Sequence, residues 1–368
     1  MIEDFDSAVV LLLNERAKAN SKLLELRGPG DGVPSAELKS EQISRILSAN
    51  SQSAGPLKDN MVVSVFQEVS RMCSQLRHTV AYLGPPATFT HQASRSRFGI
   101  NANYLQCERI NDIFAAVEKG TADFGIAPIE NSTEGAISQT LDLLAASDLE
   151  VVGEVCLDIR QSLLSRAPLS RVRAVYSHPQ ALAQCRGWLQ QNAKGAEIIA
   201  ESSTARAAQL AAEARPEDGV AAISSELAAE LYHVPVIASS IQDLKTNITR
   251  FAVLRKGGPP GADSHKPSGD DKTMLVICTS DRVGALHGVL DAFKSRSINL
   301  SRIESRPSKT KAWEYIFFVD VHGHRQDEPI QQVLDQLAKD CESVRVLGSF
   351  PFVRTEEKGA VAVPPAPR

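Results

Sequence analysis

The segment 247–251 reads N-I-T-R-F and places a carboxamide, a hydroxyl and a guanidinium within five residues. A hydroxyl and a carboxamide donate hydrogen bonds without carrying charge, whereas a guanidinium binds carboxylates through paired bonds. Because side chains alternate along a strand, Thr249 and Arg250 would point to opposite faces. Asn247 and Phe251 would share the face of Thr249. The segment indicates either an ordinary strand start or one wall of an anion-binding site.

Four other segments place polar side chains directly after an expected strand. They are Gly84-Pro85-Pro86-Ala87-Thr88, Glu130-Asn131-Ser132-Thr133, Ser177-His178-Pro179-Gln180 and Glu201-Ser202-Ser203-Thr204. Ser, Thr and Asn at such turns are good helix N-caps, each contributing about 1 kcal/mol. The same neutral donors at helix N-termini also form an anion pocket, and α/β sheets bind ligands where loops leave the carboxyl ends of their strands.

The sequence has no metal or nucleotide motif. It lacks a G-x-x-x-x-G-K pattern, a spaced group of metal ligands and a Ser-His-Asp order, and its six cysteines include no C-x-x-C pair. His322 and His324 flank Gly323, but two histidines at a turn without acidic or Cys partners favour solvent exposure over a metal site. We therefore expect chemistry that needs neither a metal nor a cofactor.

Length and composition indicate a soluble protein of several domains. The chain has 368 residues, of which 43% are hydrophobic and 23% charged, and it carries a net charge of -4. This charge argues against a general nucleic-acid or anionic-membrane binder. The longest apolar run, 8–13, is too short to span a membrane, and the acidic N-terminus lacks the basic start of a signal peptide. A cytoplasmic location is expected.

Two joints divide the chain. Residues 256–272 contain almost nothing apolar and many Gly and Pro residues, which is typical of a linker. Near Arg77-His78, helical periodicity gives way to a strand-like pattern. The expected parts are a helical domain at 1–77, a second domain at 79–256, a linker at 257–272, a third domain at 273–354 and a disordered tail at 355–368.

The middle segment alternates apolar strands with helix-like stretches, which predicts an α/β fold with largely parallel sheets. Its candidate strands are 80–83, 124–129, 151–155, 172–176, 197–200, 220–223 and 251–254. The last segment reads strand, helix, strand, strand, helix, strand between 274 and 347. That order predicts a ferredoxin-like βαββαβ unit.

The first segment has the apolar periodicity of a helix. At about 100° per residue, Arg16 lies roughly 20° and Arg27 roughly 40° from Phe5 around the axis. Arg16 could lie at the edge of a bundle with only its stem covered. Alternatively, the bundle interior binds a small dicarboxylate through paired guanidiniums.

The motifs of the middle and last segments resemble those of prephenate dehydratase carrying a C-terminal ACT domain. They are Tyr82-Leu83-Gly84-Pro85, Thr88-Phe89, the segments 128–132, 177–185, 203–205 and 247–251, and then Gly284-Ala285-Leu286, Glu304-Ser305-Arg306-Pro307 and Leu347-Gly348-Ser349. The resemblance covers roughly 80–353 and implies a two-lobed catalytic domain like that of periplasmic binding proteins. One departure is Pro86-Ala87, where the family usually has a glycine.

The resemblance implies conversion of prephenate to phenylpyruvate, with loss of water and carbon dioxide and no cofactor. Thr249 matches the essential threonine and would donate a hydrogen bond to the departing hydroxyl. Arg250 would reach the substrate only if the strand bends. The residues expected to bind substrate are Thr88, Glu130, Asn131, Ser132, Ser177, His178, Gln180, Ser203, Thr204, Asn247, Arg250 and Phe251.

The ACT resemblance implies regulation by phenylalanine and a homodimer or homotetramer. The residues expected to bind phenylalanine are Gly284, Ala285, Leu286, Glu304, Ser305, Arg306 and Pro307. Gly284 would leave room for the effector backbone. The alternative is a purely structural dimerisation unit.

The first segment resembles the small helical chorismate mutase that is often fused ahead of this enzyme. Arg16 and Glu41 match its substrate-binding arginine and its glutamate. Arg27 stands where the family has lysine, Glu37 where it has aspartate, and Ser40 where it has arginine. The first-helix arginine of the family is not matched, and Gln75 is the nearest candidate for its final glutamine. Mutase activity is therefore left open.

Two other functions are compatible with these motifs. Arogenate dehydratase would use the same pocket for a substrate with an amino group. A non-catalytic amino-acid sensor would combine a two-lobed cleft with an ACT domain, but it would not need the hydroxyl of Thr249 or the donors Asn131 and Ser132.

Overall fold

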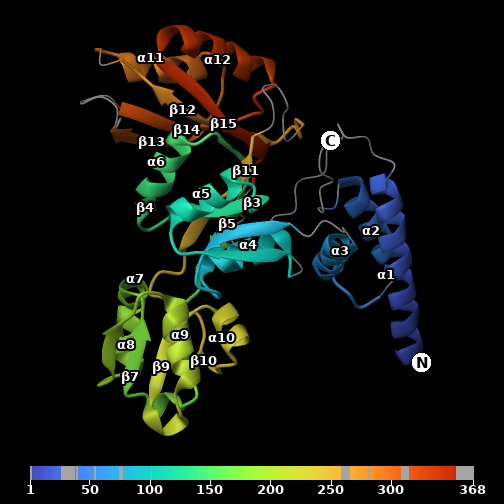
Figure 1. Ribbon diagram of the computed structural model, residues 1–368, viewed down its shortest axis with the longest axis vertical. Coiled ribbons are helices and arrows are strands. Elements are labelled where there is room, and N and C mark those ends of the chain that lie inside the picture. Colours follow the sequence, from blue (N-terminus) through green and yellow to red (C-terminus); the bar gives the residue numbers. More distant parts are fainter. Residues whose placement is uncertain are drawn as a thin grey trace. The chain divides into compact units, whose positions relative to one another are not determined.

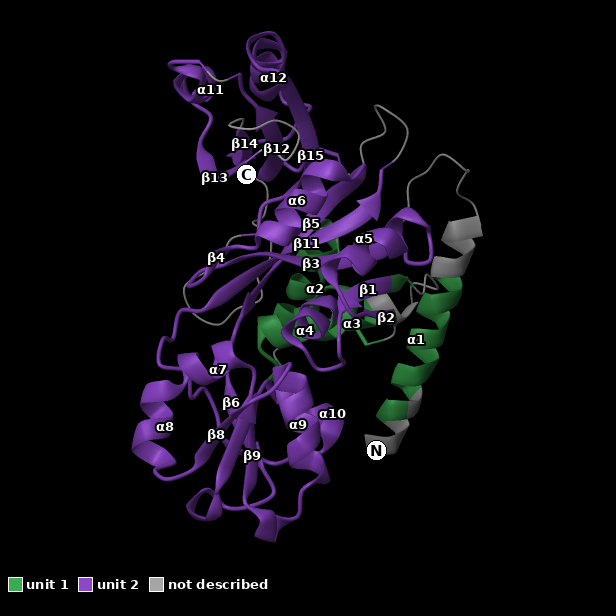
Figure 2. Ribbon diagram, turned by 60° about the vertical axis from the view of Figure 1, so that its left-hand side comes forward, with its two compact units in different colours: residues 1–79, 95–103, 355–368 green, residues 80–94, 104–354 purple. Residues whose placement is uncertain are grey.

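The computed structural model of the chain describes residues 2–25, 38, 40–53, 55–73, 78–100, 102–257, 266–280, 282–307 and 315–353. Two compact units are distinguished in Figure 2. One comprises 1–79, 95–103 and 355–368, and the other 80–94 and 104–354. The expected tail at 355–368 lies outside the described residues.

The N-terminal unit is helical, as expected. Its helices are α1 (Ile2–Glu25), α2 (Ser40–Ser53) and α3 (Asp59–Cys73), and α3 contacts both α1 and α2. The apolar stripe that predicted α1 is not covered in this unit, because Phe5 is 66% and Leu12 69% exposed. An apolar face left in water favours association with another surface.

The second unit begins with a six-stranded sheet, which we call the first lobe (Figure 1). Its strand order is β2-β1-β3-β11-β5, with β4 paired to β3. The strands are β1 (Thr79–Leu83), β2 (Asn103–Cys107), β3 (Phe124–Asn131), β4 (Gly135–Ala136), β5 (Leu149–Asp158) and β11 (Ile248–Lys256), and the helices are α4 (Phe89–Phe98), α5 (Ile110–Glu118) and α6 (Ser138–Ala146).

A five-stranded sheet of order β10-β6-β9-β7-β8 forms the second lobe, separate from the first in Figure 1. Its strands are β6 (Ser162–Ser165), β7 (Ala174–Ser177), β8 (Glu197–Ala200), β9 (Val220–Ser224) and β10 (Val236–Ala238). Its helices are α7 (Pro179–Gln184), α8 (Arg186–Asn192), α9 (Thr204–Glu213) and α10 (Glu226–Tyr232), with short 3-10 turns at Leu169–Arg171 and Pro216–Asp218.

Both lobes are mixed sheets, which corrects the expectation of largely parallel ones. β1 and β3 are parallel, as are β7 with β8 and with β9. The chain leaves the first lobe at the end of β5 and returns along β11. Because it returns from the second lobe, β11 runs antiparallel to both β5 and β3. A motif-based assignment of parallel strands misses such a return strand.

The C-terminal domain is the expected βαββαβ unit. Its antiparallel sheet has the order β13-β14-β12-β15. The elements are β12 (Asp271–Cys278), α11 (Ala285–Lys294), β13 (Leu300–Pro307), β14 (Tyr315–His322), α12 (Glu328–Asp340) and β15 (Ser343–Pro351). β12 begins at Asp271, so two of its residues come from the segment expected to be linker.

Both faces of this C-terminal sheet are buried. On one face, Leu275 and Ile277 pack against the helices through Val289 and Phe293. On the other face, Met274 shares a core with residues of the first lobe. That shared core also contains Val276, Phe318, Leu347 and Phe350 of the C-terminal domain and Val151, Ala252 and Leu254 of the first lobe.

Gly348 permits a close approach of β15 to β5. A Cβ at this position would collide with the backbone of Val151, including its carbonyl oxygen. No other residue type fits there without moving one of the strands. The glycine of the Leu347-Gly348-Ser349 motif is therefore required by the contact between the C-terminal domain and the first lobe.

Candidate active site

Thr249 and Asn131 face each other on adjacent strands. They are paired in register between β11 and β3, and the side-chain amide of Asn131 donates to Thr249 Oγ1 at 2.8 Å and to Asn247 Oδ1 at 2.8 Å. All three side chains are at most 8% exposed. The expected grouping of Asn247, Thr249 and Asn131 is present in the structure.

The orientation of the Asn131 amide is fixed by its other end. Its Oδ1 accepts hydrogen bonds from the backbone N–H of Thr133 at 3.0 Å, from the Thr133 hydroxyl at 2.6 Å and from the backbone N–H of Glu134 at 3.1 Å. An oxygen must therefore occupy that end, and the NH2 must face Thr249. Thr249 Oγ1 accepts from Asn131, and no acceptor among the described residues takes its hydroxyl proton.

Ser132 stabilises the start of β11. Its backbone N–H donates to Ile248 O at 2.8 Å, and its Oγ accepts from the Ile248 N–H at 3.0 Å. The same hydroxyl lies 3.4 Å from the Thr246 carbonyl oxygen, to which it donates. Ser132 thus fixes the position of Asn247 and Thr249 relative to β3.

The loop after β1 connects the two lobes. The backbone carbonyls of Pro86 and Ala87 accept hydrogen bonds from Tyr232 at 2.9 Å and from Ser225 at 3.2 Å, both in the second lobe. Ser225 directly follows β9, so the carboxyl end of β1 meets the carboxyl end of β9. The Thr88 hydroxyl donates to Leu83 O at 2.8 Å, inside its own loop.

The backbone conformation of Ala87 shows why the family usually has a glycine in this loop. Its φ is 71°, in the left-handed region that costs a non-glycine residue roughly 1–2 kcal/mol. A glycine would adopt it freely, which is the physical reason for a glycine there. Ala87 is fully buried, and its N–H donates to His91 Nδ1 at 3.0 Å. These contacts hold the loop in place.

In the second lobe, the expected donors act first as caps. His178 accepts from the Gln180 N–H at the start of α7, and Ser203 accepts from the Arg206 N–H at the start of α9. Ser177 is buried and donates to Ile223 O at 2.7 Å. Since β7 and β8 are parallel, the loops carrying these residues leave the same sheet edge, where the half-buried Thr204 and the exposed Gln180 also lie.

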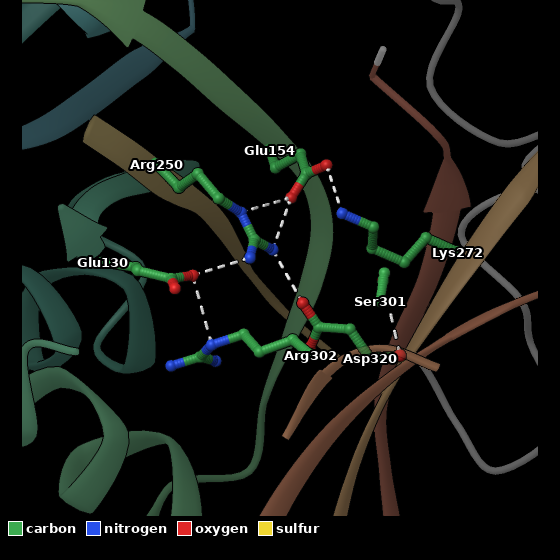
Figure 3. Close-up of polar contacts among 7 residues, drawn as sticks. All are labelled: Glu130, Glu154, Arg250, Lys272, Ser301, Arg302 and Asp320. Carbon is green, nitrogen blue, oxygen red and sulfur yellow. Dashed lines mark hydrogen bonds and ion pairs between the residues drawn. The ribbon is translucent and has the colours of Figure 1, made fainter. Parts of the chain in front are cut away.

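Arg250 lies on the face of β11 opposite Thr249, and Figure 3 shows its partners. Its guanidinium contacts Glu130 at 2.8 Å, Glu154 at 2.8 Å and Asp320 at 2.7 Å. Arg302 Nε lies 3.2 Å from Glu130, and Lys272 Nζ lies 2.7 Å from Glu154. We call these six residues the ion-pair network.

The network keeps Arg250 charged. Burial lowers the pKa of Arg250, but the carboxylates of Glu154 and Asp320 raise it by more, so the net shift is upward. The expected contact of Arg250 and Glu130 with substrate needs a correction, because these two side chains bind each other and turn away from Thr249. The register shift between Arg250 and Phe251 does not turn the Arg250 guanidinium toward Thr249. Phe251 is a 2% exposed core residue.

The expected effector residues lie at the start of α11 and on β13. Gly284 has a φ of 81°, so the backbone there favours glycine, and open space adjoins it. β13, an edge strand of the C-terminal sheet, carries Glu304 and Ser305. Arg306 lies 3.3 Å from Asp142 of α6. Ala285 and Leu286 begin α11, and Pro307 ends β13.

Part of the mutase-like site is described. Arg16 is half-buried in α1, and Glu41 is exposed in the first turn of α2, which Ser40 begins. Arg27, Glu37 and Gln75 lie outside the described residues.

The expectation for the two histidines is wrong for His324, which is fully buried. Its Nδ1 accepts from the Gln326 N–H, and its own N–H donates to Asp327. The described residues contain no group of three or more side chains that could hold a metal ion. None of the described helices has the length and hydropathy of a membrane-spanning one.

Sequence reasoning missed Glu154, Lys272, Arg302 and Asp320. The available signal was a charged residue inside an apolar strand, as in V-D-V at 319–321. A buried charge needs a partner, but the sequence does not say which one. Sequence reasoning also missed Ser225 and Tyr232, which hold the loop after β1.

This fold and site define a prephenate dehydratase domain joined to an ACT domain. The family models of these names match residues 80–259 and 273–339. The chain belongs to the bifunctional chorismate mutase/prephenate dehydratase family. It is 39% identical to the member from Aquifex aeolicus (strain VF5), over 97% of both chains.

Solved structures agree with this fold. Prephenate dehydratase from Arthrobacter aurescens in complex with L-Phe is 34% identical, with a TM-score of 0.68, and the match covers 78% of this chain and 94% of that one. GqqA, described as a novel type of quorum quenching acylase, is 29% identical with a TM-score of 0.67, covering 74% and 97%. Because one fold carries both descriptions, the reaction must be argued from the site.

Proposed function

We propose that the chain converts prephenate to phenylpyruvate, water and carbon dioxide. The observation that carries this proposal is the Asn131–Thr249 hydrogen bond, which leaves the threonine proton free to donate. The pair lies at the end of β3, whose parallel neighbour β1 continues into the loop that contacts the second lobe. A substrate bound between these carboxyl ends would meet the hydroxyl of Thr249.

The reaction suits a neutral donor. The ring carboxylate leaves as carbon dioxide, and its bonding electron pair enters the ring. The ring becomes aromatic as the bond to its hydroxyl breaks, and the departing oxygen takes one proton to leave as water. A threonine is too weak an acid to ionise, so Thr249 would donate a hydrogen bond while the proton arrives by relay from solvent.

Uncharged groups also suit the carboxylate that leaves. A guanidinium clamp would stabilise this carboxylate more in the reactant than in the transition state. Asn131, Ser203 and Thr204 offer dipoles and helix N-termini instead, and the one arginine beside Thr249 is occupied by three carboxylates. The same residues are the ones expected to hold the substrate.

The test is Thr249→Val, which preserves shape and removes the hydroxyl. We expect kcat for phenylpyruvate formation to fall about 100-fold or more, with prephenate affinity by calorimetry changed by less than about threefold. Thr121→Val, in the turn that follows α5, is the matched control and should keep wild-type kinetics. Unchanged turnover by Thr249→Val would remove Thr249 from the mechanism. Parallel assays with arogenate separate the two dehydratase activities, and a sensor would bind without turnover.

We also propose that phenylalanine regulates the enzyme at the ACT domain and that the protein is a homodimer or larger. The segments 284–286 and 304–307 would bind the effector. The edge strand β13 and the exposed apolar residues of α1 support association of two copies. Phenylalanine titration by calorimetry and light scattering tests both proposals.

The helical unit is proposed to supply prephenate from chorismate. Support comes from the similarity to bifunctional relatives along nearly the whole chain and from Arg16 and Glu41. Ser40, in place of an arginine, predicts weak chorismate binding, because a guanidinium–carboxylate pair is lost. Prephenate formation from chorismate measures this activity directly.

A further inference from the structure

Thr249 and Asn131 each have a sequence neighbour whose side chain lies on the opposite face of the sheet, namely Arg250 and Glu130. Thr249 pairs with Asn131 in the β11–β3 ladder, and the next pair in the ladder is Arg250 with Glu130. The first pair forms a hydrogen bond within the site, and the second forms an ion pair toward the ACT domain. A displacement of Arg250 and Glu130 therefore moves the backbone that carries Thr249 and Asn131.

Each of three ACT strands supplies one charged side chain to the ion-pair network, in which Lys272 binds Glu154, Arg302 binds Glu130 and Asp320 binds Arg250. Lys272 comes from β12, Arg302 from β13 and Asp320 from β14. The side chain of Asp320 is 1% exposed and that of Arg302 is 5% exposed. Charges this deeply buried are sensitive to the exact position of their partners, because removing one partner leaves a buried charge uncompensated.

The network leaves three polar atoms unsatisfied. Arg302 Nη1 and Nη2 and Asp320 Oδ1 are buried and make no hydrogen bond with the residues that the structure describes. These two residues are register partners across β13 and β14, so their side chains leave the same face of the sheet. Instead of binding each other, Arg302 binds Glu130 and Asp320 binds Arg250, both in the first lobe.

A second arrangement would satisfy these atoms. If Arg302 turned to Asp320, the guanidinium and the carboxylate would pair within the ACT sheet. Arg250 would then lose Asp320, and Glu130 would lose Arg302. An unsatisfied buried polar group costs roughly 1–3 kcal/mol. The second arrangement recovers this cost but loses the two ion pairs to Arg250 and Glu130, so the two arrangements can be close in free energy. Two discrete pairings of one cluster are what a conformational switch requires.

We propose that Arg302 and Asp320 form the switch by which an effector bound to the ACT domain changes the dehydratase site, with Arg250 and Glu130 as positioning residues. The inference rests on the proposed function, because it takes phenylalanine as the effector. Glu304 and Ser305 lie two and three residues from Arg302 on β13. Ordering of this strand by phenylalanine would bias the choice of Arg302 between Glu130 and Asp320.

The test is Arg302→Met in the full chain, which keeps an unbranched apolar stem and removes the guanidinium and its charge. The measured quantity is the ratio of kcat/KM for prephenate without and with saturating phenylalanine. We expect this ratio to fall to within about twofold of one, while calorimetry still detects phenylalanine binding. By reciprocity, saturating phenylpyruvate should change phenylalanine affinity in the wild type but not in the variant.

Arg325→Met is the matched control. Arg325 forms an ion pair with Glu150 at 3.4 Å across the same interface, away from Thr249. This variant should keep the wild-type ratio. If Arg302→Met does not fold, judged by circular dichroism, Asp320→Asn carries the same test with no change in volume. A wild type that neither turns over prephenate nor binds phenylalanine contradicts the proposed function. A responsive wild type together with an equally responsive Arg302→Met overturns the switch alone.

Discussion

The side-chain amide of Asn131 donates to the hydroxyl oxygen of Thr249 at 2.8 Å and holds that oxygen as an acceptor. The direction of this bond decides what the threonine can do. While Asn131 donates to one lone pair of this oxygen, the hydroxyl has its proton available for a substrate. The Asn131–Thr249 pair therefore presents one hydroxyl proton that no acceptor among the described residues takes.

Asn131→Asp should reverse the direction of this bond. A carboxylate accepts only, so the Thr249 proton would turn to residue 131, away from the substrate. We expect kcat for phenylpyruvate formation to fall about 100-fold or more. Asn111→Asp is the control, since Asn111 is exposed and accepts from Gln139, which an aspartate also does. Equal kinetics for the two variants would argue against a role for the amide.

Glu154→Gln should destabilise the protein by roughly 3–5 kcal/mol, because the buried Lys272 loses its carboxylate partner and Arg250 keeps only two of its three. The measurement is the shift of the urea unfolding transition of the second unit. Asp158→Asn, on the same strand, breaks a pair that is 43% exposed on the aspartate side and should cost less than about 1 kcal/mol. Similar losses for both would contradict the burial argument.

Gly348→Ala should weaken the contact between β15 and β5, because the added methyl group collides with the Val151 backbone. A loss of more than about 2 kcal/mol in unfolding free energy is expected, since neither strand can move alone. Gly288→Ala is the matched control, for which a change of stability in the opposite direction is expected. It lies within α11 with open space around it and should stabilise the helix by up to about 1 kcal/mol.

Tyr82 should make the protein sensitive to alkali. Burial, with smaller effects of Tyr232 and Cys107, raises the pKa of Tyr82 to about 12, above its unfolded value near 10. Its stabilising contribution is therefore complete below pH 10 and lost between pH 10 and about 12, since the unfolded chain ionises first. Over that pH range, the free energy of unfolding should fall by about 2 kcal/mol less in Tyr82→Phe than in the wild type, as measured by urea unfolding. Parallel pH profiles would contradict this.

Arg16→Ala should abolish prephenate formation from chorismate and leave phenylpyruvate formation from prephenate within about twofold of wild type. The physical reason is the loss of a guanidinium partner for a carboxylate. Lys18→Ala on the same helix, whose exposed ammonium lies 2.7 Å from Glu15, is the control for a general charge effect. Loss of both activities in Arg16→Ala would place the helical unit in the dehydratase reaction as well.

Side-chain alternation along 247–251 correctly placed Thr249 and Arg250 on opposite faces of one strand. The same rule could not identify the partners of Arg250, since Asp320 lies 70 residues away in another domain. Long-range pairing of this kind depends on how two sheets stack, and no local pattern encodes it. The order of strands and helices, in contrast, was sufficient for the α/β class of the lobes and for the βαββαβ unit, but not for the antiparallel return strand β11.

The loops after the strands illustrate the same limit. Ser203 is an N-cap in the structure, as its position before a helix predicted, whereas the cap in the loop after β7 is His178 and not a Ser, Thr or Asn. Whether a cap also binds a ligand depends on what lies opposite it, and this is set by the contact between Ala87 and Ser225. That contact joins residues 138 positions apart. His324 was misjudged for a related reason, because its burial follows from the tertiary packing around the turn after β14.

The core that Met274 and Phe350 share with Val151 and Leu254 means that the ACT domain cannot be removed without exposing part of the first lobe. A dehydratase fragment cut after residue 257 would expose the apolar flank of its own central sheet and leave Glu130, Glu154 and Arg250 open to water. Such a fragment should aggregate or need a solubilising partner. In this architecture, the ACT domain and the first lobe share one core, so a substitution that suits one of them must also suit the other.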